Sequence, residues 1–264
     1  MRAVPRRRRQ PPQHAAGSAD HTMWRRLLAE FTGTALLVSV VVGSGIAAQQ
    51  LSPTDSGLQL LENSIATTFG LAALILLFGP VSGAHLNPVV SGADWVLGRR
   101  SATGLAGGDV LAYTAAQVLG AIAGAMLANV MFDRKLIELA TRERLTTGHF
   151  VGEVVATAGL VALIFALART KRAGSSAAAV GVCIGAAYWF TSSTSFANPA
   201  VTVGRVFSDS FTGIAPGSVA GFIAAQVVGA LIGVALVVAL YPDAVETADE
   251  VVLPHPTVSR PTQN

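Results

Sequence analysis

Two six-residue stretches carry the strongest structural signal in this chain, and they are Ala84-His85-Leu86-Asn87-Pro88-Val89 and Ser195-Phe196-Ala197-Asn198-Pro199-Ala200. Both contain an Asn-Pro pair followed by a small or branched apolar residue. Asn is a preferred N-cap and Pro is favoured at the first helical position, so each pair predicts the start of a helix. The apolar piece after each pair is too short to cross a bilayer. The sequence therefore predicts two re-entrant half-helices.

The two stretches belong to an internal repeat. Three pairs of positions correspond at nearly constant separations along the chain: Glu30 with Glu153, Asn87 with Asn198, and Gln117 with Gln226. Each half also holds three long apolar stretches, and because three is odd the second half must lie inverted relative to the first. Inverted repeats bring equivalent segments together at the middle of the bilayer. We therefore expect Asn87 and Asn198 to meet there, one from each side, at the centre of a pore.

The composition places the chain in a membrane. Hydrophobic residues make up 52% of the 264 residues and charged residues only 12%, about half the charged share of a typical soluble domain, which excludes a soluble protein. Six stretches are long enough to cross a hydrocarbon core of about 30 Å. They lie near residues 24–48, 63–79, 109–131, 150–168, 175–193 and 217–241. The expected fold class is an all-α membrane protein with six transmembrane helices, two re-entrant half-helices and inverted three-helix repeats.

Polar ends flank one channel domain. We expect residues 1–22 and 243–264 to be disordered cytoplasmic tails around a channel domain at 23–242, whose repeats cover about 23–132 and 149–242. Most of the 18 basic residues lie on the side of the amino-terminal tail. The positive-inside rule therefore places both termini in the cytoplasm. The arginine-rich start is interpreted as a cytoplasmic anchor, and no nucleic-acid partner is expected.

The two half-helices would give the pore its selectivity. Non-helical backbone is tolerated at mid-membrane only where it is buried in protein or lines water. Two positive helix ends would converge on the pore centre, and each Asn amide would have N–H groups left for a passing hydroxyl. Such a site orients neutral polar solutes and repels cations and protons.

Over about residues 24–241 the chain resembles the major intrinsic proteins, which are the aquaporins and glycerol facilitators. The resemblance rests on three stretches: Ala29-Glu30-Phe31-Thr32-Gly33-Thr34, Ser82-Gly83-Ala84-His85-Leu86-Asn87-Pro88-Val89 and Asn198-Pro199-Ala200. It implies a homotetramer in the plasma membrane with a pore in each subunit. It also implies passive, bidirectional flow of water or small uncharged solutes, with neither a cofactor nor a catalytic residue.

The family resemblance assigns six residues to the pore centre: Asn87, Pro88, Val89, Asn198, Pro199 and Ala200. Two positions depart from the family pattern. Val89 stands where the family usually has Ala, a modest steric change near the constriction. Val201 stands three residues after Asn198, where water-conducting members typically carry Arg, so the filter is expected to be wider and more apolar. This departure favours glycerol-like polyols or metalloid hydroxides such as arsenous acid, as in the bacterial subgroup that lacks this arginine and is linked with arsenite permeation.

Further residues are expected to line the selectivity filter. Ser195 matches a family filter position whose backbone carbonyl faces the pore. The second span should contribute Phe69 or Thr67, and the fifth span Tyr188 or Ala186. Of these pairs we favour Phe69 and Tyr188.

Charged residues are expected at the mouths and in the spans. Arg205, one helical turn beyond Val201, would form a basic outer vestibule, and its repeat counterpart Asp94 an acidic inner mouth. Alternatively, both side chains pair with neighbouring loops. Glu30 and Glu153 are expected to accept hydrogen bonds from the unwound backbone before each half-helix, in preference to relaying protons.

Three alternatives to a solute channel remain open at this point. One is a water-selective aquaporin. Another is a coupled secondary transporter, which also uses inverted repeats and broken helices but normally needs ionisable groups at its binding site. The third is a structural or junctional membrane protein with a closed pore. No metal site is expected, because the five histidines lack metal-ligand spacing and Cys183 is the single cysteine.

Overall fold

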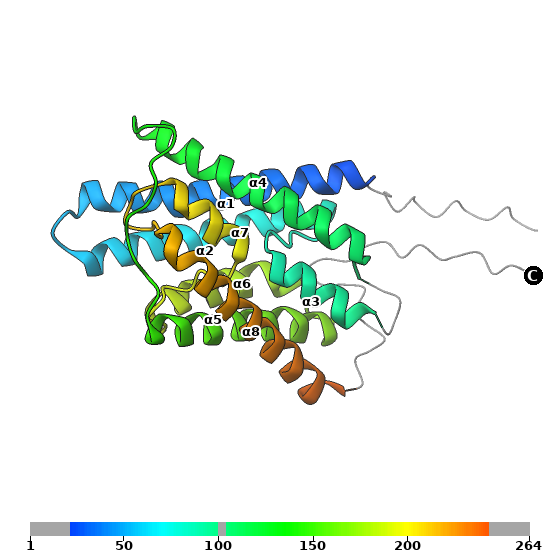
Figure 1. Ribbon diagram of the computed structural model, residues 1–264. Coiled ribbons are helices and arrows are strands. Elements are labelled where there is room, and N and C mark those ends of the chain that lie inside the picture. The colour runs from blue at the N-terminus through cyan, green and yellow to red at the C-terminus, as the bar shows by residue number, and fades with distance from the viewer. Residues whose placement is uncertain (1–21, 100–103, 243–264) are drawn as a thin grey trace, which may run out of the picture.

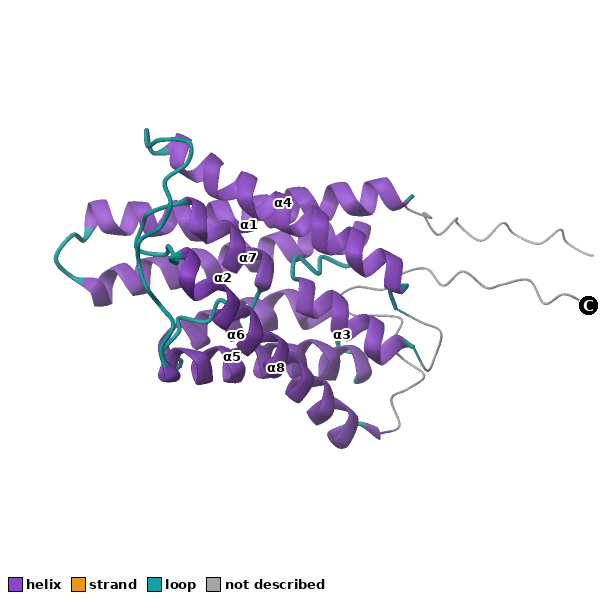
Figure 2. Cartoon of the chain, viewed as in Figure 1, coloured by secondary structure: helices purple, strands orange, loops and turns teal. Residues whose placement is uncertain are grey.

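The computed structural model describes residues 22–99 and 104–242 as helices joined by loops (Figures 1 and 2). In chain order the elements are α1 (Met23–Leu51), α2 (Ser56–Ser82), α3 (Pro88–Gly98), α4 (Gly107–Met131), α5 (Thr147–Arg169), η1 (Ala173–Ser175), α6 (Ser176–Phe190), α7 (Pro199–Gly204), η2 (Arg205–Phe207) and α8 (Pro216–Leu240). The long helices α1, α2, α4, α5 and α8, together with η1–α6, are long and apolar enough to cross a membrane. The predicted six-span α-helical fold class is therefore confirmed. Apart from Thr22, the predicted tails lie outside the described residues.

The helices form two equivalent halves. α1 packs most extensively on α4 and α2, and its repeat counterpart α5 packs most extensively on α8 and also on α6. The short helices α3 and α7 begin near the middle of the bundle and run toward opposite ends of it (Figure 1). α1 begins and α8 ends at one end of the bundle, which we call the terminal end, and α7 runs toward the other, the loop end.

Glycines let the helices of each half approach closely. Gly120 and Gly124 on α4 lie against the backbone of α1, and Gly229 and Gly233 on α8 lie against the backbone of α5. A Cβ added at Gly229 would stand only 2.5 Å from the Val154 carbonyl oxygen. Small residues four apart permit this close packing of helices in membranes. Both halves thus use two glycines four residues apart to bring neighbouring helices into close contact around the half-helices.

Candidate functional site

Two asparagines start the half-helices at the middle of the bundle. Asn87 has an extended backbone with φ −157°, and its Oδ1 accepts the Val89 N–H at 3.1 Å. Asn198 has φ −156°, and its Oδ1 accepts the Ala200 N–H at 3.0 Å. Each side chain therefore caps the half-helix that begins at the proline after it, as expected for Asn-Pro pairs.

The same two side chains join the half-helices to each other. The Asn87 Nδ2 donates to the Ala197 carbonyl at 2.8 Å, and the Asn198 Nδ2 donates to the Leu86 carbonyl at 2.7 Å. Each amide thus bonds to the residue before the other asparagine. Because an amide nitrogen carries two N–H groups, each Nδ2 keeps one donor for a solute.

The loop before each asparagine has the same uncommon backbone. Ala84 and Leu86 have φ of 47° and 48°, and their repeat equivalents Ser195 and Ala197 have φ of 49° and 48°. A non-glycine residue in a sparsely populated region costs about 1–3 kcal/mol, so surrounding contacts must hold these loops.

Two fully buried carboxylates supply those contacts. Glu30 accepts the N–H groups of His85 and Leu86 at 3.0 and 2.7 Å. Glu153 accepts those of the two equivalent residues in the second half at 2.8 and 2.9 Å. A glutamine from α4 or α8 also donates to each carboxylate at 2.7 Å. These bonds are those expected of acceptors for unwound backbone.

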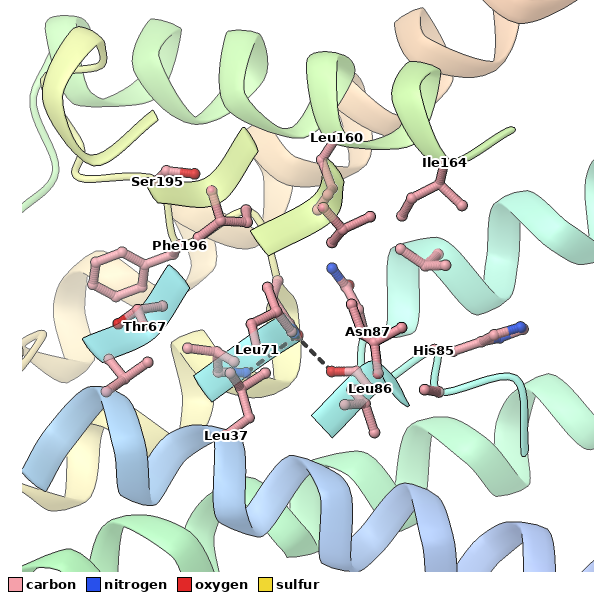
Figure 3. Close-up of a pocket in the computed structure, with 18 of the residues that line it drawn as sticks. Leu37, Thr67, Leu71, His85, Leu86, Asn87, Leu160, Ile164, Ser195 and Phe196 are labelled. Carbon is pink, nitrogen blue, oxygen red and sulfur yellow. Dashed lines mark hydrogen bonds between the residues drawn. The ribbon is translucent and has the colours of Figure 1, made fainter. Parts of the chain in front are cut away.

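A narrow cavity of about 60 Å³ is lined in part by both asparagines. Much of its wall is apolar and comes in repeat-related pairs: Leu37 with Leu160, Val41 with Ile164, Leu71 with Val180, and Ile75 with Ile184. Figure 3 shows Asn87 and Leu86 between Thr67 at one end of the cavity and His85 at the other. The wall toward the loop end is more polar, because it includes Tyr188, Ser195 and Arg205 as well as Thr67.

The prediction that Phe69 lines the filter is wrong. Its side chain is 70% exposed on the outer face of α2. Thr67, in contrast, is 2% exposed, lines the cavity and shares a 3.1 Å hydrogen bond with the Tyr188 hydroxyl. Thr67 and Leu71 share one helix face, and position 69 is two residues off it. On α6, Tyr188 lies in the wall as expected, and Ala186 is exposed on another face.

The residues next to the two asparagines divide between the cavity and its surroundings. Val201 lies in the cavity wall and is 5% exposed. Val89 does not line the cavity; with Pro88 and Pro199 it borders an apolar groove beside α8. The expectation that Val89 exerts a steric effect at the constriction is therefore wrong. Ala200 is fully buried. Of the six residues predicted for the pore centre, only the two asparagines line the cavity.

The two predicted mouth residues differ in their surroundings. Asp94 is buried away from the cavity, and its Oδ2 accepts the Leu105 N–H at 2.8 Å, so it holds the loop before α4. The predicted acidic mouth is wrong, and pairing with a loop describes Asp94. Arg205 does line the cavity. Its Nε donates to the Thr212 carbonyl at 2.5 Å, and its guanidinium carbon lies 3.4 Å from the centre of the Phe196 ring.

Sequence reasoning missed a second arginine near this mouth. Arg144, in the loop between α4 and α5, is 5% exposed and donates to the Gly213 and Phe211 carbonyls at 2.7 and 2.8 Å. Burial, and then the positive charges of Arg205 and Arg142, lower the pKa of the Arg144 guanidinium well below its ordinary value. The loop has no hydrophobic period, so nothing in the sequence indicated that this side chain is buried.

Comparisons with known proteins give a consistent result. The sequence matches the family described as "Major intrinsic protein" over residues 18–195. It is 46% identical over 217 residues to the aquaglyceroporin AqpS of Rhizobium meliloti, an alignment that covers 82% of this chain and 90% of AqpS. It is 33% identical over 169 residues to the glycerol uptake facilitator protein of Pseudomonas aeruginosa, covering 55% of this chain and 58% of that protein. The fold is similar to the X-ray structure of the aquaglyceroporin from Plasmodium falciparum, with a TM-score of 0.56, 20% identity, and coverage of 84% of this chain and 96% of that one.

Proposed function

The chain belongs to the major intrinsic protein family, and on that premise we propose that it conducts glycerol-like polyols and metalloid hydroxides such as arsenous acid, together with water. Members of this family are channels and not enzymes, and this chain is a passive channel for small neutral solutes. The observation that carries the choice of solute is Val201, an apolar side chain in the cavity wall beside the paired asparagines.

The cavity suits a solute that is polar on one side and apolar on the other. The free N–H groups of Asn87 and Asn198 can donate to hydroxyl oxygens, with each bond contributing about 0.5–1.5 kcal/mol net. The carbon backbone of a polyol can lie against the apolar wall formed by residues such as Leu71 and Leu160. The positive ends of the two half-helices disfavour cations at this point. With Val201 in place of a guanidinium at this position, the path beside the asparagines admits solutes larger than water, while the Arg205 guanidinium lies one turn further out.

The relatives support part of this proposal. One is named an aquaglyceroporin and the other a glycerol uptake facilitator, which supports glycerol as a solute. Arsenous acid is proposed for a physical reason, since it is a small neutral molecule with three hydroxyl groups that matches the same donors. Glu30 and Glu153 bind backbone N–H groups, which supports their structural role over ion coupling.

We place the channel in the plasma membrane as a homotetramer with both termini in the cytoplasm. The positive-inside rule supports this orientation through the basic residues at the terminal end of the helices, which are Arg25, Arg26, Arg169, Lys171 and Arg172. Large apolar side chains on the outer surface suit lipid or a neighbouring subunit, and examples more than half exposed are Leu76, Leu119 and Leu231. Cross-linking of the purified protein should give products of up to four subunits. If no product larger than one subunit forms, the proposed assembly is wrong.

Stopped-flow measurements on proteoliposomes test the solute. The purified full chain should speed glycerol and arsenous acid entry over protein-free liposomes, without any ion gradient. Water flux with no glycerol or arsenous acid flux would instead identify a water-selective channel. A requirement for an ion gradient would identify a coupled transporter, and no flux of any of the three would identify a closed pore.

A further inference from the structure

Two buried arginines meet one aromatic ring at the loop end of the cavity. The guanidinium carbon of Arg205 lies 3.4 Å from the centre of the Phe196 ring, and that of Arg144 lies 5.2 Å from the same centre. Both distances refer to one ring, so the two positive charges lie within about a Debye length of each other at physiological salt. Like charges this close repel, particularly where burial reduces the screening by water.

These two charges have no acidic partner in the part of the chain that the structure describes. The ion pair found among those residues joins Arg134 to Glu138, in the loop between α4 and α5. Within the described ranges the Arg144 guanidinium donates to backbone carbonyls and to no side chain. The nearby carboxylate of Glu153 is occupied by two backbone N–H groups and a glutamine. Burying an unpaired charge is unfavourable, so a bound anion would relieve the cost at this site.

The donors of Arg205 are available to the cavity. Its Nε is held by the Thr212 carbonyl and one face of its guanidinium lies on Phe196. Among the described residues its two terminal nitrogens make no hydrogen bond, although the side chain lines the cavity. They form the fork that matches two oxygens of a carboxylate or phosphate. A further donor, the hydroxyl of Ser195, lies in the same cavity wall, is buried, and has no hydrogen-bond partner within residues 22–99 and 104–242.

We propose that Arg205, together with Ser195 in the same cavity wall and with the charge of Arg144 near the same Phe196 ring, forms a binding site for a small oxyanion at the loop-end mouth of the pore. The inference rests on the channel proposed above, because the bound anion occupies the path of neutral solutes and slows their flux. Val201, one turn before Arg205 on the same wall, leaves room for this ligand.

The anion is held at the mouth and does not pass through. Beyond the asparagines the wall is apolar, with residues such as Ile75 and Ile164. An ionised oxyanion that moved there would lose its guanidinium partner and its hydration together, which is strongly unfavourable. The site is therefore a block for charged molecules at the entrance of a neutral-solute path.

Inorganic phosphate is the probe for a flux experiment. Glycerol entry is measured in proteoliposomes that hold the full chain, with phosphate on both sides or with chloride at matched ionic strength and osmolarity. We expect phosphate to lower glycerol flux in a saturable way, and chloride to have no such effect. Arg205→Gln should raise the half-inhibitory phosphate concentration by about tenfold or more, because the guanidinium fork is lost. Arg144→Gln should raise it by a smaller factor.

Matched variants separate this effect from folding and from total charge. Arg134→Gln removes an arginine of the same loop that is already paired to Glu138, and it should leave the half-inhibitory concentration unchanged. Arg205→Lys keeps the charge without the fork, so its value should lie between those of the original chain and Arg205→Gln. In detergent solution, phosphate should also raise the thermal unfolding midpoint of the original chain, but not that of Arg205→Gln.

The outcomes are distinct. Normal glycerol flux that phosphate does not inhibit would overturn the anion site and leave the channel standing. Inhibition that is the same in the original chain, Arg205→Gln and Arg205→Lys would overturn the assignment to Arg205. If the original chain shows no glycerol flux, the proposed function fails, and the unfolding midpoint alone decides the anion site. A midpoint that responds equally to phosphate and chloride would then overturn it.

Discussion

At position 201 a valine side chain forms part of the cavity wall, and one turn further along the chain Arg205 carries a buried positive charge. The two positions are not equivalent. The Arg205 guanidinium is held against Phe196 and the Thr212 carbonyl, so its place at the wall is fixed. A guanidinium at position 201 would start nearer the asparagines and reduce the width of the path itself.

Val201→Arg should therefore narrow the channel. We expect water flux to persist and glycerol flux to fall by roughly tenfold or more, which corresponds to a barrier raised by about 1.4 kcal/mol. Val201→Met adds length without charge and is the matched control for bulk. Stopped-flow light scattering on proteoliposomes measures both fluxes. Unchanged glycerol flux in Val201→Arg would show that position 201 does not face the path.

Thr67 and Phe69 provide a second test on single residues. Thr67→Val removes the hydroxyl that bonds to Tyr188 and keeps the side-chain shape. Without this bond of about 0.5–1.5 kcal/mol the Tyr188 hydroxyl is no longer held at the cavity wall, and we expect the glycerol-to-water flux ratio to change by about two- to tenfold. Phe69→Leu changes only the exposed outer face of α2 and should leave the ratio as it is. The reverse pattern would place Phe69, and not Thr67, in the filter.

Helices could be predicted where the sequence has a capping pair, a repeat or a long apolar run. α3 and α7 begin at Pro88 and Pro199, as the Asn-Pro pairs predict. α2 begins at Ser56, earlier than the predicted 63, because Asp55 caps it by accepting the Leu58 N–H at 2.9 Å. Hydropathy alone does not detect such a polar first turn.

The candidate site was predictable in its centre and less so at its edges. The repeat indicated that Asn87 and Asn198 meet, and the repeat can be recognised from the sequence alone. The sequence left Phe69 and Thr67 both open for the second span, and the structure decides between them because Thr67 lies one helical turn from Leu71 on the face that lines the cavity. Arg144 lies in a loop without a period, and only the three-dimensional contacts bring it to Phe196.

The close packing of α5 on α8 requires a glycine at position 229. A Cβ at Gly229 would meet the Val154 carbonyl oxygen at 2.5 Å and the Thr157 Cβ at 2.9 Å. Gly229→Ala should lower the free energy of unfolding by about 1–3 kcal/mol, as overpacking does. At Gly159 on α5 an added Cβ would meet no atom of another described element within 4 Å, so Gly159→Ala should change the free energy of unfolding by less than about 1 kcal/mol and in the stabilising direction. Unfolding in mixed detergent micelles measures both, and equal effects would contradict the close packing at Gly229.

Across the whole molecule, the two halves contribute equally to the centre of the pore and unequally to its mouths. Each half supplies one buried glutamate, one loop with residues of positive φ and one capping asparagine at equivalent positions. The symmetry ends toward the loop end, where the second half alone supplies Arg205 and Tyr188 to the wall. Permeation through the centre should therefore depend on both halves alike. Recognition at the loop end should depend more on the second half, to which the first half adds Thr67.

This division predicts similar defects from substitution of either asparagine. Asn87→Leu and Asn198→Leu each remove an N-cap worth about 0.5–2 kcal/mol and a donor worth about 0.5–1.5 kcal/mol to a passing hydroxyl. Glycerol flux per folded channel should fall by up to about tenfold in both. Asn63→Leu is the matched control, since it removes a buried amide that bonds to α1 but does not itself line the cavity, and its flux per channel should stay near that of the original chain. Flux must be divided by the folded protein in each preparation, because a lost cap also reduces folding. If either half-helix variant folds and conducts glycerol at the original rate, the paired asparagines are not the point that limits permeation.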